Sequence, residues 1–171
     1  MSEPNDDRVV APLRELRAKL HDGLRQLHVA AEGVESAEPR VALAAAEQAS
    51  EYAQKVLGPY SHAEEFTLFP AVDGVLATRG ACQVMVAQHA SLAAMSNDLE
   101  RVLEAAARSG ELSEFRRFLL PLLHGLYAAA RTHLEAEDDA YLPLLDEHLS
   151  ESQVGVIVDN MERIVAGNKA P

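Results

Sequence analysis

The sequence has 171 residues, of which 48% are hydrophobic and 25% are charged, and this is the size and composition of one folded domain. Fifteen Lys and Arg residues against 27 Asp and Glu residues give a formal net charge of −12 at pH 7. An acidic chain repels phosphate backbones and anionic lipid headgroups, so neither nucleic acid nor a membrane is expected as a partner.

Cysteine usage and hydropathy indicate the cytoplasm. Cys82 is the only cysteine, which excludes an internal disulfide and a cluster of thiolate ligands. The first residues, MSEPNDDRVV, lack the basic and apolar regions of a signal peptide. No apolar run reaches the roughly 20 residues that span a bilayer. We therefore expect a cytoplasmic protein that is a monomer or a weak homodimer.

The elements expected along the chain are helices, because strand-type alternation is nearly absent and strong helix formers dominate. The expected helices cover residues 12–35, 40–75, 81–108, 113–149 with an interruption near Pro143, and 152–166. Gly110 follows Ser109 as a stop signal, because glycine adopts the left-handed conformation that ends helices. Pro59, Pro70 and Pro121 fall inside expected helices, and each should kink or shorten its helix.

Four long helices with short connections predict an all-α fold, an antiparallel up-down four-helix bundle with a short C-terminal fifth helix. The expected organisation is a flexible N-terminus at 1–11, the bundle at 12–149, and a C-terminal helix and tail at 150–171.

Two segments carry similar patterns of possible metal donors: residues 60–72, YSHAEEFTLFPAV, and residues 133–145, HLEAEDDAYLPLL. Tyr60 precedes Glu64 by four residues, and His133 precedes Glu137 by four. On a helix this spacing puts both side chains on one face with Cβ atoms about 5–6 Å apart. Imidazole and carboxylate together are ligands for iron, zinc or manganese, so each segment is a candidate for half of a metal site.

Bundle geometry indicates which donors meet, because residues at similar distances from a connecting turn lie at similar depth. Counting from the turns brings His21, His89 and His133 to one layer, together with the donors of the two paired segments. The match is poorer for His28. We therefore predict a metal site with a donor from each long helix, formed by His21, Tyr60, Glu64, His89, His133 and Glu137.

The ordered pattern resembles the hemerythrin-like (HHE cation-binding) proteins, which are non-haem di-iron four-helix bundles. The resemblance spans roughly residues 14–149. It rests on His21, the run from Tyr60 to Pro70, the isolated His89, and His133 with Glu137. In this family the second helix of the bundle, here the expected helix at 40–75, usually brings His where this sequence has Tyr60. The run is similar to a subset of actinobacterial members with Tyr at this position. Hemerythrins proper carry a second His on the third helix, four residues before or after the first. Here the first is His89, and the positions four residues away hold Met85 and Ala93.

The resemblance implies two Fe ions joined by an oxo or hydroxo bridge, with Zn or Mn as substitutes. Glu64 and Glu137 would bridge the ions, and His21, His89 and His133 would be terminal ligands. The metal charge would lower the pKa of the Tyr60 hydroxyl and make it a phenolate, which is a hard anionic donor that favours Fe(III) over Fe(II). A ferric preference works against reversible O2 carriage and favours catalase-like peroxide disproportionation or reaction with NO. The alternative is an iron, oxygen or redox sensor, or an O2-binding protein without turnover.

Several further residues are alternatives or neighbours of this site. His62 is the alternative to Tyr60 as the ligand from the expected helix at 40–75, although the two lie about 200° apart around a regular helix. His62 would pair with Glu65. His28 shares the face of His21. Asp138 is expected to contact the metal ligands without being a ligand itself. A metal-free bundle with structural histidines is the remaining alternative.

Overall fold

The structure is a computed structural model that describes residues 9–36, 38–110 and 112–167. The regular elements of these residues are all helical, which confirms the predicted all-α fold. Most of the predicted flexible N-terminus, the end of the predicted tail and residue 37 of the first expected turn lie outside the described residues.

The first and third long helices match their predicted ranges within two residues. Helix α1 covers Ala11–Ser36 and helix α5 covers Gln83–Ser109. The buried face of α1 is a leucine stripe with helical spacing, formed by Leu13, Leu16, Leu20, Leu24 and Leu27. As predicted, α5 ends at Gly110, which has a left-handed φ of 75°.

The second predicted helix is divided into four elements: α2 (Pro39–Tyr52), the π-helix η1 (Ala53–Leu57), α3 (Gly58–Phe66) and α4 (Leu68–Leu76). Its prolines explain the divisions, because a proline ring clashes with the carbonyl four residues earlier. For Pro59 that carbonyl belongs to Lys55, in the wider turn of η1. For Pro70 it belongs to the last residue of α3, and the helix breaks at Thr67, whose φ is −132°.

The fourth predicted helix is interrupted close to Pro143, as expected. It comprises α6 (Leu112–Ala136), the π-helix η2 (Glu137–Tyr141) and α7 (Leu142–His148). The carbonyl four residues before Pro143 belongs to Asp139, inside η2, so this π-turn has the same proline explanation as η1. Pro121 does not end α6, which runs on for fifteen residues beyond it. The predicted shortening is therefore absent there.

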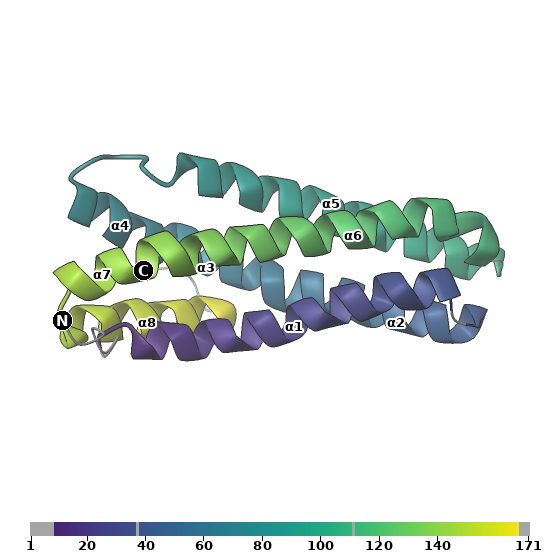
Figure 1. The fold of residues 1–171 in the computed structure, drawn as a ribbon, viewed down its shortest axis with the longest axis horizontal. Coiled ribbons are helices and arrows are strands. Elements are labelled where there is room, and N and C mark those ends of the chain that lie inside the picture. The colour runs from purple at the N-terminus through teal and green to yellow at the C-terminus, as the bar shows by residue number, and fades with distance from the viewer. Residues whose placement is uncertain (1–8, 37, 111, 168–171) are drawn as a thin grey trace, which may run out of the picture.

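The long helices lie lengthwise along one another in an elongated bundle (Figure 1). Helix α1 packs against α2 and α6, and α5 packs against α6 and α2. The predicted C-terminal helix is α8 (Glu151–Val165). It begins with a capping box at Ser150 and lies against α3 and α1. Helices α1 and α2 approach closely at Gly23, where a Cβ would lie 1.8 Å from the ring of Tyr52. None of the described helices is long and apolar enough to cross a lipid bilayer.

Candidate metal centre

Four of the predicted ligands meet in the interior of the bundle. Glu64 comes from α3, His89 from α5, His133 from α6, and Glu137 is the first residue of η2. All four are buried, and each offers a ligand atom within 4.8 Å of the others. Residues far apart in the sequence thus form one compact group of metal-binding type.

Each histidine of this cluster is held by a hydrogen bond at its outer nitrogen. His89 Nδ1 lies 2.9 Å from Glu65 Oε1, and His133 Nδ1 lies 2.9 Å from Gln88 Oε1. Carboxylate and amide oxygens only accept, so both Nδ1 atoms donate and both Nε2 atoms face the cluster. Glu65 was predicted as a neighbour of the site, whereas Gln88 was not among the predicted residues.

The two inner nitrogens and one inner oxygen of the cluster are not fully satisfied by hydrogen bonds. His89 Nε2 and His133 Nε2 are 2.8 Å apart, so either one of them carries a proton or both bind one cation. First-row metal ions bind imidazole nitrogen at about 2.0–2.1 Å, which puts two nitrogens on adjacent positions of one ion about 3 Å apart. Glu137 Oε1 is buried and accepts no hydrogen bond from the described residues, although His133 Nε2 is 3.4 Å away. A cation would satisfy these atoms together, so the residues present fit a metal ion.

A buried arginine that the sequence analysis did not select completes the centre. Arg17 of α1 is only 3% exposed. Its Nη1 donates to Glu64 Oε1 at 3.1 Å and to Glu137 Oε2 at 2.7 Å, and its Nε donates to Asp138 Oδ1 at 2.6 Å. Its Nη2 donates to the carbonyl of Leu134 at 2.9 Å. The signal for it was its place within the leucine stripe of α1, because a cation on a buried face needs an anionic partner.

Burial and mutual repulsion separate the two carboxyl groups of the cluster. Burial raises the pKa of Glu64, and the negative charge of Glu137 raises it further. Burial also acts to raise the pKa of Glu137, but the neighbouring imidazole of His133 and the positive charge of Arg17 outweigh it and hold that pKa below its ordinary value. In the metal-free chain Glu137 therefore keeps its negative charge to a lower pH than Glu64 does. As the pH falls, Glu64 is protonated first.

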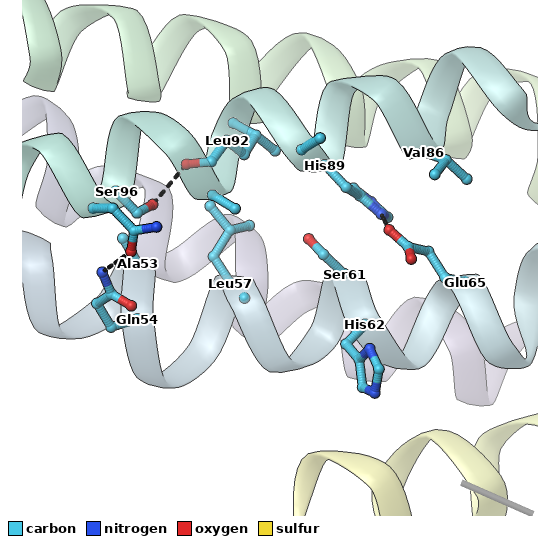
Figure 2. A pocket seen from close by; sticks show the side chains of 14 residues that line it. Ala53, Gln54, Leu57, Ser61, His62, Glu65, Val86, His89, Leu92 and Ser96 are labelled. Atoms are coloured by element: carbon cyan, nitrogen blue, oxygen red, sulfur yellow. Dashed lines mark hydrogen bonds and ion pairs between the residues drawn. The ribbon is translucent and has the colours of Figure 1, made fainter.

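Three of the predicted histidines and Asp138 lie outside this cluster. His21 Nε2 pairs with Asp138 Oδ2 at 2.8 Å, and its side chain is 40% exposed. Asp138 thus connects His21 to Arg17 on the outer side of the centre. His28 is half-buried and stacks on Tyr127 with ring centroids 5.1 Å apart. His62 is exposed and points away from His89 (Figure 2).

Tyr60 lies on α3 one turn before Glu64 and is buried. Burial raises the pKa of its hydroxyl, and the negative charges of Glu162 and Glu64 raise it further, so the metal-free chain holds a neutral phenol. The burial of Tyr60 and the exposure of His62 fit Tyr60 better as the inward residue of this helix. Its role as an iron ligand stays a prediction.

A pocket of about 350 Å³ opens beside the centre, between η1 and α3 on one side and α5 on the other (Figure 2). Its walls are apolar at Leu57, Val86 and Leu92. It reaches the centre at His89 and at the hydrogen-bonded carboxylate of Glu65, whose side chain is 30% exposed. A small molecule in this pocket would therefore contact the histidine that carries one of the inner nitrogens.

The four side chains are buried inside a helical bundle and could hold a metal ion. The sequence matches the family described as Hemerythrin HHE cation binding domain over residues 10–145, which is most of the chain. The chain belongs to this family, which confirms the predicted resemblance. No curated protein and no solved structure matches it significantly.

Proposed function

We propose that the protein is a non-haem iron protein that binds or reacts with small oxidants, namely peroxide, O2 or NO. The observation that carries the proposal is the buried cluster of Glu64, His89, His133 and Glu137, with ligand atoms within 4.8 Å of one another. We take the bundle to be the antiparallel up-down four-helix bundle of the sequence prediction, since α1 packs on α2 and α6 while α5 packs on α6 and α2.

The residues around the cluster support a reactive centre with access from one side. Glu65 and Gln88 orient the two imidazoles so that both Nε2 atoms point inward. The buried positions of Glu64 and Glu137 exclude bulk water from the opposite side. Bound iron would supply the electron transfer that peroxide or O2 chemistry needs, and the pocket at His89 would admit a small ligand.

The family resemblance also implies a two-iron form with an oxo or hydroxo bridge, and the sequence offers His21 and Tyr60 as its further ligands. A second ion between the outer oxygens of Glu64 and Glu137 would meet Arg17 there. In this form Arg17 has to leave its position.

The experiment is anaerobic loading with Fe(II), removal of loosely bound metal, and exposure to hydrogen peroxide with an oxygen electrode. We expect bound iron and oxygen evolution above that of free iron. His133→Ala should lose both, since it removes an inner nitrogen. His124→Ala is the matched control, because His124 is an exposed histidine of the same helix. Equal iron binding by His133→Ala and the unaltered protein contradicts the site. Iron binding without oxygen evolution contradicts the peroxide reaction and leaves only the binding of small ligands.

A further inference from the structure

We propose that the centre binds one metal ion per chain and that the guanidinium of Arg17 takes the place and charge of a second cation. The inference rests on the proposed function, because it concerns the same cluster. It differs from the two-iron form predicted from the sequence. What carries it is the position of Arg17, a buried cation that contacts both cluster carboxylates.

Each of the two cluster carboxylates has one oxygen near an imidazole and the other oxygen on Arg17. Glu64 Oε2 lies 3.4 Å from His89 Nε2, while its other oxygen accepts from Arg17 at 3.1 Å. Glu137 Oε1 lies 3.4 Å from His133 Nε2, while its other oxygen accepts from Arg17 at 2.7 Å. The carboxylates thus bridge two positions: one is lined by imidazole nitrogens, and the other holds a guanidinium.

The position on the side of Arg17 is chemically unlike a metal site. A guanidinium has five N–H donors, has no lone pair for a metal and keeps its charge at every physiological pH. Three carboxylates contact it: Glu64, Glu137 and Asp138. Its single positive charge leaves two negative charges in this group, and one divalent ion on the histidine side neutralises them. A second divalent ion would add charge beside a buried cation in a medium of low dielectric constant.

The contacts of Arg17 hold it in this position. The carbonyl of Leu134 and the carboxylate of Asp138 fix the remaining edges of the guanidinium. Leu13, Leu16 and Leu20 of α1 are buried around its attachment point, so withdrawal of the side chain would leave a gap in the bundle interior. His21, one turn along α1, already pairs with Asp138 on the outer side. Helix α1 therefore supplies a cation to the centre in place of an imidazole ligand.

The test is the number of metal ions in the unaltered full-length protein. The chain is loaded anaerobically with excess Fe(II), passed through a desalting column and analysed by mass spectrometry for iron per chain. We expect one equivalent, and after oxidation an electron paramagnetic resonance signal of isolated high-spin Fe(III). Two equivalents per chain, with the signal lost through coupling of bridged ions, would overturn the inference and favour the two-iron form.

A pair of variants tests the part of Arg17 itself. Arg17→His replaces the cation with a side chain that has a lone pair, and we expect iron content to rise from one toward two equivalents. Arg17→Lys keeps the charge and should stay at one. Arg25→His is the matched control on the exposed face of α1 and should also stay at one. If a folded Arg17→His variant stays at one equivalent, Arg17 is not what excludes a second ion. If it does not fold, the count for the unaltered protein decides.

Failure of this inference and failure of the proposed function give different results. Two equivalents per chain that are both lost in His133→Ala keep the metal centre and overturn only the one-ion form. No retained iron, or iron retained equally in His133→Ala, overturns the metal centre and with it the one-ion form. One equivalent that is lost in His133→Ala and kept in His124→Ala supports both.

Discussion

Replacement of Arg17 by methionine tests the electrostatics of the metal-free centre. Methionine keeps an unbranched side chain but removes the charge between Glu64 and Glu137. Removal of one partner from a buried ion pair costs about 3–5 kcal/mol, because the remaining charge stays buried without compensation. Of the three carboxylates that lose their partner, Glu64 and Glu137 are buried, so little of this cost is relieved by water. We therefore expect a loss of about 3–5 kcal/mol in the free energy of unfolding at pH 7.

The loss should depend on pH. The pKa of Glu64 is already raised by burial and by Glu137, and deletion of Arg17 raises it further. A carboxyl group with a folded-state pKa above its unfolded value makes the protein less stable as the pH rises through that interval. The Arg17→Met variant should therefore come closest to the unaltered protein near pH 4–5, around the ordinary glutamate pKa, and should fall furthest behind at neutral pH.

The assay is urea unfolding in EDTA, followed by circular dichroism at several pH values. Arg25→Met is the control, because Arg25 is on the same helix with a side chain that is 73% exposed. Its ion pair with Asp22 is exposed, so the change should stay within about 0.5 kcal/mol. A loss for Arg17→Met no larger than that of the control at pH 7 refutes the reasoning.

Four further changes test the packing and the centre. Gly23→Ala should lose about 1–3 kcal/mol or more in urea unfolding, because the new Cβ overlaps the ring of Tyr52; an unchanged midpoint contradicts the close approach. Tyr52→Phe removes a 2.7 Å hydrogen bond to the Leu20 carbonyl and should cost about 1 kcal/mol at neutral pH. Burial raises the pKa of this phenol, so the unaltered protein should lose stability above about pH 10, and the variant should lose less. Glu65→Ala removes the acceptor of the His89 Nδ1 hydrogen bond and should weaken metal binding about 10–100-fold in a competition titration, and unchanged affinity would show that this hydrogen bond does not matter. Tyr60→Phe should remove a visible phenolate-to-Fe(III) band from the oxidised iron protein, and a band that survives excludes Tyr60 as its source.

Much of the fold and the four residues of the cluster were predictable because they depend on spacing along the helices. Helical periodicity placed α1 and α5 within two residues of their ends. The four-residue spacing of His133 and Glu137 put both on one helix face, and the structure brings them into the cluster. Proline chemistry indicated the interruptions near Pro70 and Pro143. Each of these properties is decided within one or two helical turns of a single segment.

Only the tertiary structure decided which residue of α1 reaches the centre. Arg17 and His21 are one turn apart on the same face, so periodicity does not separate them. The choice depends on how far α1 is offset along α3 and α6, and loop lengths and π-turns determine that offset. Counting along regular helices did not include η1 and η2, which change the phase of the residues that follow them. The sequence by itself specified which side chains can bind a metal, and packing between helices selected which of them meet and put a fixed positive charge among them.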